Sequence, residues 1–240
     1  MLLAGALIFV LGGLVKGLLG IGLPLVVVPL LSLGEPAARA IAMVAVPVLL
    51  SNSWQAWDSG YSWAGVRRFM PLIEMLLITT LITVPMTLAM SDASLRRALA
   101  IVVIIAVAVN ALPIKLNVPR SQERWWSAGV GALSGVMGGV SSLTGPVIIA
   151  YLVSLRLPRE VFVGTISIIY LAGAIPLYGS MAAQGRFALH DVLLSALALL
   201  PMAVGLGMGK ALRGKLSEAV FRRVLLGFLV VVALGLLFKG

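Results

Sequence analysis

The residues Gly13-Leu-Val-Lys-Gly17-Leu-Leu-Gly20 return, with the same glycine spacing, as Gly131-Ala-Leu-Ser-Gly135-Val-Met-Gly138 in the second half of the chain. A proline and an apolar run follow each copy, from Pro24 to Leu33 and from Pro146 to Leu155, after four extra residues in the second copy. Glycine and proline positions therefore agree together, which chance similarity between apolar segments does not explain. Internal repeats of this kind are typical of secondary transporters.

The composition around these repeats is that of a polytopic membrane protein. Of the 240 residues, 61% are hydrophobic and 11% are charged, whereas average soluble domains hold about 45–50% apolar and about 25% charged residues. The mean hydropathy is +1.13. These values exclude a soluble enzyme, a secreted disulfide scaffold and a disordered tail protein. The chain has no cysteine and one histidine, so we expect no metal site and no cofactor.

The net charge of +10 describes membrane topology rather than a surface for nucleic acid. The Lys and Arg residues fall in the short gaps between apolar runs, where such residues set the orientation of a protein in the bilayer. We therefore expect the lipid bilayer, and no nucleic acid, as a partner of this chain.

Eight apolar stretches, each able to fill about 30 Å of hydrocarbon, make up nearly the whole chain. They lie near 2–33, 37–57, 69–90, 97–114, 125–155, 161–183, 189–209 and 219–238. We interpret them as an all-α polytopic fold of two homologous repeats, 1–118 and 119–240, in one integral membrane domain.

The first segment of each repeat, 2–33 and about 124–155, is too long for one ordinary crossing and is interrupted by glycine and proline. Each is either a broken, tilted helix or a re-entrant hairpin that returns to the side from which it came. The re-entrant alternative leaves three transmembrane helices per repeat and gives the stronger asymmetry of Lys and Arg between the two sides. We favour it. The repeats are then inverted relative to each other, and both termini face away from the cytoplasm.

The two interruptions form the candidate substrate site, because irregular backbone at membrane depth is tolerated only inside protein or beside water. Proline suits the first turn of a helix, so Pro24 and Pro146 would open two helices whose positive N-termini favour an anion. The alternative is that the glycines only allow close helix packing and the hydroxyls cap a helix. The candidate binding residues at the interruptions are Gly20, Gly22, Pro24, Ser141, Ser142, Thr144 and Gly145.

Among single residues, Lys16 is the strongest candidate for contact with the substrate. A lysine near the bilayer centre costs about 2.5–3.5 kcal/mol, so we expect it to contact substrate or a counter-ion rather than to reach an interface. Asn52 and Gln55, in the polar cluster that closes the second segment, would add polar contacts. Glu74 is a candidate for proton coupling, with pairing to a neighbouring arginine as the alternative reading.

Catalysis is not expected, and no catalytic residue is assigned. An enzyme of this type needs a nucleophile with a base. The single histidine, His190, lies at a segment edge, and neither Gly-x-Ser-x-Gly nor His-Glu-x-x-His occurs in the chain.

Over nearly its whole length the chain resembles the sulfite exporter TauE/SafE family of membrane permeases. The order and doubling of glycine-rich motifs make the resemblance specific, although each motif alone is weak. The sequence departs from the family pattern where Leu23-Pro24 replaces a third glycine and Trp57-Asp58 stands in place of a histidine. The residues that carry the resemblance are Gly17-Leu-Leu-Gly-Ile-Gly22, Pro29, Gly131, Gly145-Pro146, Tyr151-Leu152 and the segment from Ala42 to Trp63.

The resemblance implies export of a small anion, typically sulfite or an organosulfonate such as sulfoacetate, across the inner (plasma) membrane of a bacterial-type cell. Alternating access would come from rocking of one repeat against the other, and a homodimer would suit so small a transporter. Three alternatives remain open: a small carboxylate as substrate, a channel, or a non-transporting scaffold or assembly subunit whose small-residue surfaces pack against partners.

Overall fold

A computed structural model describes residues 2–20, 22–59, 66–111, 118–212, 215 and 217–239, and all regular structure within these ranges is helical. Two short 3-10 turns, η1 (Arg67–Phe69) and η2 (Arg120–Gln122), precede α6 and α8. The helices are α1 (Leu2–Leu19), α2 (Leu23–Ser32), α3 (Ala37–Met43), α4 (Ala45–Asp58), α6 (Met70–Leu88), α7 (Asp92–Ala111), α8 (Glu123–Ser141), α9 (Gly145–Ser154), α10 (Arg159–Ala183), α11 (Leu189–Leu197), α12 (Leu199–Leu212) and α13 (Glu218–Lys239).

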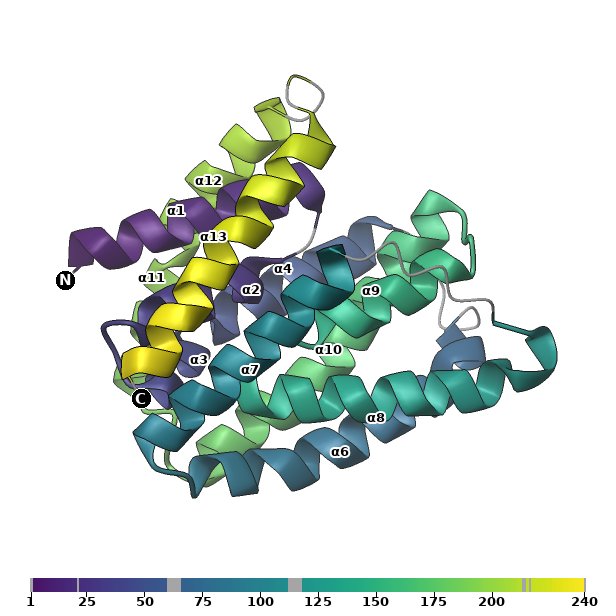
Figure 1. The fold of residues 1–240 in the computed structure, drawn as a ribbon, viewed down its shortest axis with the longest axis horizontal. Helices are drawn as coiled ribbons and strands as arrows, with labels where there is room; N and C mark the ends of the chain where they lie inside the picture. The colour runs from purple at the N-terminus through teal and green to yellow at the C-terminus, as the bar shows by residue number, and fades with distance from the viewer. Residues whose placement is uncertain are drawn as a thin grey trace.

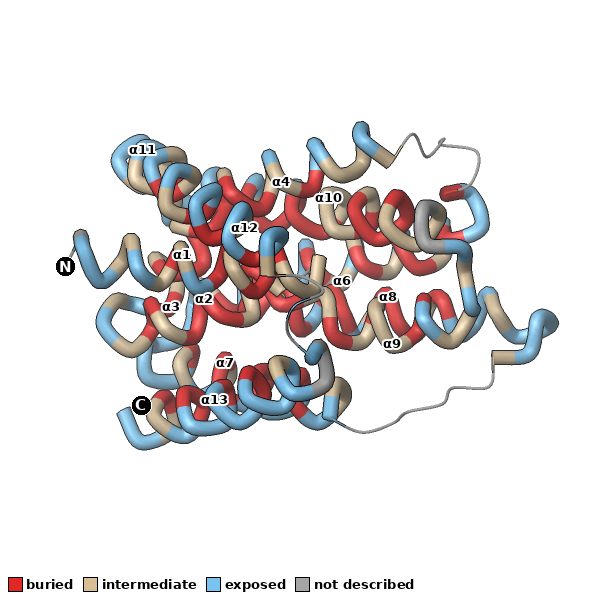
Figure 2. Tube along the Cα trace, turned by 90° about the horizontal axis from the view of Figure 1, so that it is seen from above, coloured by how far each residue is buried: buried red, intermediate tan, exposed pale blue. Residues whose placement is uncertain are grey.

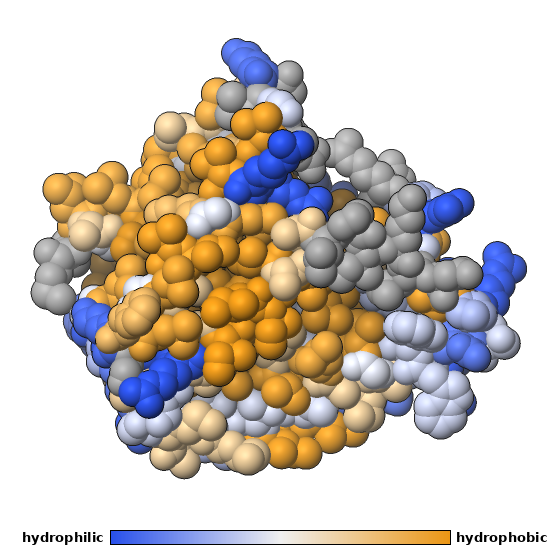
Figure 3. Space-filling model, viewed as in Figure 1, coloured by the Kyte–Doolittle hydropathy of each residue, from blue (hydrophilic) through white to orange (hydrophobic). Residues whose placement is uncertain are grey.

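Five helical stretches in the described chain are long and apolar enough to cross a membrane. The sixth predicted crossing corresponds to α7, which is 20 residues long and is not among the five. Figure 3 shows hydrophobic residues over most of the middle of one face, with hydrophilic residues mainly towards its margins. A soluble monomer rarely exposes so broad an apolar surface, and the molecule has the features of a multi-pass membrane protein. The five stretches are Ala37–Asp58, Arg67–Leu88, Val161–Ala183, Leu189–Leu212 and Val220–Lys239.

Both predicted interruptions are present, and each turns the chain back on itself. Gly20 and Gly22 have φ of 81° and 102° between α1 and α2, and Ser142 has φ of 62° between α8 and α9. Glycine adopts this left-handed region without steric cost. The two arms contact each other in each pair. In Figure 1, α2 returns towards the end of the molecule at which α1 begins, and α9 returns towards the opposite end, at which α8 begins.

Small residues bring the two hairpins into close contact with helices from the other half of the chain. A Cβ atom on Gly13 of α1 would collide with the backbone of Met202 in α12. A Cβ atom on Gly131 of α8 would collide in the same way with Leu72 of α6. For these two glycines the packing alternative is correct. Each predicted repeat therefore packs its first helix against the third segment of the other, which makes the protein one body.

The second predicted segment is divided into α3 and α4 by a proline. Pro47 has no N–H, and its ring clashes with the carbonyl group four residues earlier, on Met43. The hydroxyl of Ser195 in α11 donates to that carbonyl oxygen at 2.8 Å and accepts from the N–H of Val46 at 3.0 Å. The backbone groups freed by the break are thus satisfied inside the membrane, as they must be.

The most enclosed element is α2, in which seven of ten residues are buried. It contacts α1, α3, α7 and α13. Figure 2 shows buried residues along the inward sides of the surrounding helices, while exposed residues lie towards the periphery. An apolar helix of only ten residues cannot span the hydrocarbon, so its position inside the bundle is what keeps its ends away from lipid.

Candidate functional site

A cavity of about 310 Å³ lies where the two interruptions meet, at the lower end of the ~300–1,000 Å³ usual for small-molecule sites. Both hairpins, α4 and α10 form its walls, and it extends to the last turn of α7 and the first turn of α13. Most of its wall is apolar. The polar side chains that line it are Lys16, Asn52, Gln55, Asn110, Ser142, Thr144, Tyr170 and Arg222.

The structure brings nearly all of the predicted substrate-binding residues to this cavity. Ser141 is the exception: its hydroxyl donates to the carbonyl oxygen of Met137 at 2.6 Å and accepts from the N–H of Leu143 at 3.2 Å, which is the capping role left open above. A role in binding stays a prediction for all of them. The nine residues that line the cavity are Lys16, Gly20, Gly22, Pro24, Asn52, Gln55, Ser142, Thr144 and Gly145.

Lys16 is buried at the end of α1, with 7% of its surface exposed. Its ammonium group donates to Ser51 Oγ at 2.9 Å and to Asn52 Oδ1 at 3.4 Å, both on α4. Of the acidic residues whose side chains the structure describes, none lines the cavity or forms an ion pair with Lys16. A buried ammonium without an opposite charge is costly. An anion beside Lys16 would supply the opposite charge.

Two helix N-termini add to this positive potential. Both α2 and α9 begin at the cavity wall, and Pro24 and Pro146 lie in their first turns as the sequence predicts. The N-cap residues, Gly22 and Thr144, make no side-chain capping hydrogen bond. A helix N-terminus without a side-chain cap can present its free N–H groups and partial positive charge to an anion.

One hydrogen bond from a neighbouring helix supports each interruption. Gln55 of α4 donates through Nε2 to the carbonyl oxygen of Gly20 at 3.3 Å. The hydroxyl groups of Ser142 and of Tyr178 on α10 lie 3.0 Å apart and share a hydrogen bond. The backbone at the two interruptions is thus held in place from α4 and α10, which also form the cavity walls.

The sequence analysis missed three polar residues of the cavity: Asn110, Tyr170 and Arg222. The exposed guanidinium group of Arg222 donates to the carbonyl oxygen of Asn110, and these two residues lie at the ends of α13 and α7. Arg222 belongs to a basic gap, where its charge indicates topology alone. Tyr170 stands inside an apolar run, where an aromatic side chain indicates only core packing.

Glu74 lies outside this cavity. Its side chain is exposed on α6, and the neighbouring Arg68 makes its ion pair with Glu123, with 2.7 Å between Nη2 and Oε2. Proton coupling through Glu74 stays a prediction that the geometry of the cavity does not favour.

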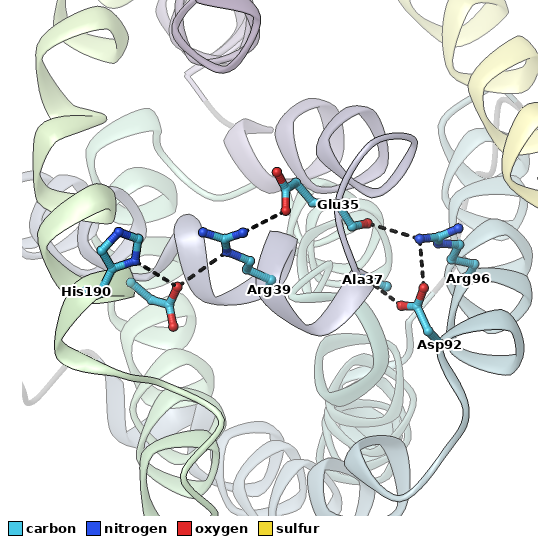
Figure 4. A network of polar contacts seen from close by, with 7 residues as sticks. Glu35, Ala37, Arg39, Asp92, Arg96 and His190 are labelled. Carbon is cyan, nitrogen blue, oxygen red and sulfur yellow. Dashed lines mark hydrogen bonds and ion pairs between the residues drawn. The ribbon is translucent and has the colours of Figure 1, made fainter. Parts of the chain in front are cut away.

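A polar network of Glu35, Arg39, Asp92, Arg96 and Asp191 ties the loop after α2 to α7 and α11 (Figure 4). Arg39 lies 2.9 Å from Glu35 and 3.5 Å from Asp191. Arg96 lies 2.7 Å from Asp92 and donates to the carbonyl oxygen of Glu35 at 3.4 Å. None of the five lines the cavity. The elements that the network joins, α3, α7 and α11, meet towards the end of the molecule at which both termini lie (Figure 1).

Comparison with known proteins gives one family. The model of the family described as Sulfite exporter TauE/SafE matches residues 5–236, a range that includes both hairpins, apart from the first residues of α1, and all of the residues shown above to line the cavity. No curated protein and no solved structure gives a match. The expected resemblance is therefore confirmed over almost the entire length, and the chain belongs to the sulfite exporter TauE/SafE family.

Proposed function

We propose that this protein is a secondary transporter that exports a small sulfonate-type anion, such as sulfite or sulfoacetate, across the inner membrane. One observation carries the proposal: a buried lysine, with no carboxylate partner among the side chains that the structure describes, faces a cavity between two helix N-termini that lack side-chain caps. An anion supplies the missing opposite charge, and a sulfonate supplies several acceptor oxygens for the surrounding donors. Membership of a transporter family agrees with a role in transport rather than catalysis.

The cavity wall favours an anion with an organic part. Apolar side chains, among them Val15, Leu19, Val48 and Ile166, make up most of the lining, and apolar surface removed from water contributes about 25 cal/mol per Å². The carbon skeleton of an organosulfonate would gain from this contact, whereas inorganic sulfate would not. The apolar wall therefore favours an organosulfonate such as sulfoacetate over both sulfite and sulfate, which have no carbon skeleton.

The arrangement of helices supports an inverted pair of repeats. The α1–α2 and α8–α9 hairpins approach the centre from opposite ends (Figure 1), and α1 packs on α12 just as α8 packs on α6. The cavity reaches Asn110 and Arg222 at one end, and the excess of basic residues in the loops favours a cytoplasmic position for that end. In this proposal the cavity would take up substrate from the cytoplasm, while the polar network lies at the other end of the molecule.

Transport by purified protein in liposomes tests the proposal. Vesicles loaded with unlabelled sulfite, sulfoacetate, sulfate or a short carboxylate would be diluted into the same labelled anion, and counterflow measured. We expect counterflow of sulfite and sulfoacetate in the wild type, and its loss in Lys16→Met. Lys210→Met is the matched control, because this exposed lysine at the end of α12 does not line the cavity. Flux equal to that of empty liposomes for every anion, with folded protein, would refute transport.

A further inference from the structure

The residues of α4 that line the cavity each have a cavity-lining counterpart on α10 at the equivalent position of the second predicted repeat. Pro24 and Pro146 are 122 residues apart, and the same spacing relates Val48 to Tyr170 and Asn52 to Ala174. All four of the latter line the cavity. Each repeat thus turns the same helical face towards it, with residues four apart on one side of the helix.

The polar residue stands at a different position of this face in each repeat. In the first repeat Asn52 is polar and Val48 is apolar, while in the second Tyr170 is polar and Ala174 is apolar. Asn52 already has a partner, because its Oδ1 accepts from Lys16. The hydroxyl of Tyr170, the polar group at the other position, needs a partner of its own.

Tyr170 makes no hydrogen bond to any residue that the structure describes. The other tyrosines of the second repeat do: Tyr151 shares a bond of 2.6 Å with Ser127, and Tyr178 one of 3.0 Å with Ser142. Tyrosine hydroxyls inside a protein nearly always have a partner. Since Tyr170 lines the cavity, the acceptor it lacks belongs to whatever occupies the cavity.

The hydroxyl also lies beside the N-terminus of α9. A Cβ atom on Gly145 would collide with Tyr170 Oη and lie 3.3 Å from Cζ, so the ring approaches the first turn of the helix as closely as glycine permits. The helix has ten residues, and Thr144 at its N-cap makes no side-chain capping bond. The phenol and the N-terminal N–H groups therefore lie next to each other at one wall of the cavity.

We propose that Tyr170 is a substrate-binding residue, which donates its hydroxyl hydrogen to an oxygen of the anion at the N-terminus of α9. This inference rests on the proposed function. The first hairpin then supplies the positive charge through Lys16, and the second supplies a neutral donor through Tyr170. The anion contacts both repeats at once, so its binding couples their relative positions.

Tyr170→Phe tests the assignment, because it removes only the hydroxyl. Binding of sulfite and sulfoacetate to the purified full-length chain would be measured by titration calorimetry, and KM and kcat by counterflow. A charge-assisted hydrogen bond predicts a rise of about 10-fold in Kd and KM with kcat unchanged. Tyr151→Phe is the matched control: it removes a hydroxyl from the same repeat, at a position outside the cavity, and should leave Kd and KM as in the wild type.

The outcomes separate this inference from the proposed function. If the wild type binds sulfite or sulfoacetate and Tyr170→Phe binds it equally well, Tyr170 is not a ligand while the transporter assignment stands. If the wild type binds no anion of the panel, both fall. If Tyr170→Phe does not fold, 3-fluorotyrosine at position 170 decides, because it keeps the ring and makes the phenol a stronger donor: a changed Kd supports the assignment and an unchanged Kd overturns it.

Discussion

Replacing Lys16 by methionine separates anion binding from folding. Methionine is a flexible, unbranched side chain that fills irregular space well, and the change removes the one buried positive charge that faces the cavity among the described residues. A hydrogen bond to a charged group contributes about 1.5–3 kcal/mol. The Kd of sulfite or sulfoacetate should therefore rise roughly 10- to 150-fold.

The same change should leave the protein as stable as the wild type, or more so. The variant loses the bonds from Lys16 to Ser51 and Asn52. Asn52 still lines the cavity, and the hydroxyl of Ser51 still donates to the carbonyl oxygen of Val48 at 3.4 Å. The substitution also removes the free-energy cost of burying an ammonium group without an opposite charge. Replacement of buried charges by apolar groups is often neutral or stabilising. We expect the apparent Tm without anion to stay unchanged or to rise.

Thermal unfolding with and without anion measures both effects in one assay. A ligand that binds only the folded state at 100 times its Kd stabilises by about 2.7 kcal/mol, so the wild type should show a rise in Tm that Lys16→Met lacks. Lys210→Met should behave as the wild type does. A Kd for Lys16→Met within twofold of the wild type would refute the assignment of Lys16, and an unfolded variant would refute the reasoning about its charge.

Three further outcomes follow from the packing and the topology. Gly205→Ala should lower the Tm, because its methyl group collides with the backbone of α1, whereas Gly207→Ala has nothing within 4 Å and should not; equal Tm values would contradict the close contact. Since the chain has no cysteine, an impermeant maleimide should label Ser91→Cys from outside and Ser217→Cys only in lysed cells, and labelling from one side would disprove the inverted arrangement. Asp191→Asn weakens the ion pair with Arg39 by under about 1 kcal/mol. If the polar network helps to close the outer end, an impermeant maleimide added outside should then label a cysteine introduced in the cavity faster. An unchanged rate of labelling would show that the network has no part in gating.

Local sequence was sufficient to predict the two interruptions. Positive φ needs glycine or a tolerant residue, and proline cannot continue a preceding helix, so Pro24 and Pro146 mark where each second arm begins. The same argument could not assign each glycine its role. Gly22 adopts a positive φ, while Gly13 packs on Met202. That difference depends on a helix almost two hundred residues further along the chain.

The charged residue of the cavity, Lys16, could be predicted from the sequence, whereas the neutral donor Tyr170 could not. Lys16 is conspicuous because lysine is rare at membrane depth. A tyrosine in an apolar run carries no such signal. Tyr170 is distinguished by its place beside Gly145 and by the absence of a hydrogen-bond partner among the described residues. Ser195 is a similar case, since its contacts with Met43 and Val46 join segments that the sequence gives no reason to pair.

The close glycine contacts bear on how alternating access would operate. In α1–α12 and α8–α6 the backbones approach so closely that a methyl group would collide with them, and such contacts resist sliding because interiors are close-packed. Each pair joins a hairpin arm of one repeat to a helix of the other. The units that rock would therefore be these interlocked pairs rather than the two halves of the sequence. In the proposed site, the anion would contact Lys16 of α1 on one side and the N-terminus of α9, which packs on α8, on the other. It would then lie between the two units, and its release would depend on their separation.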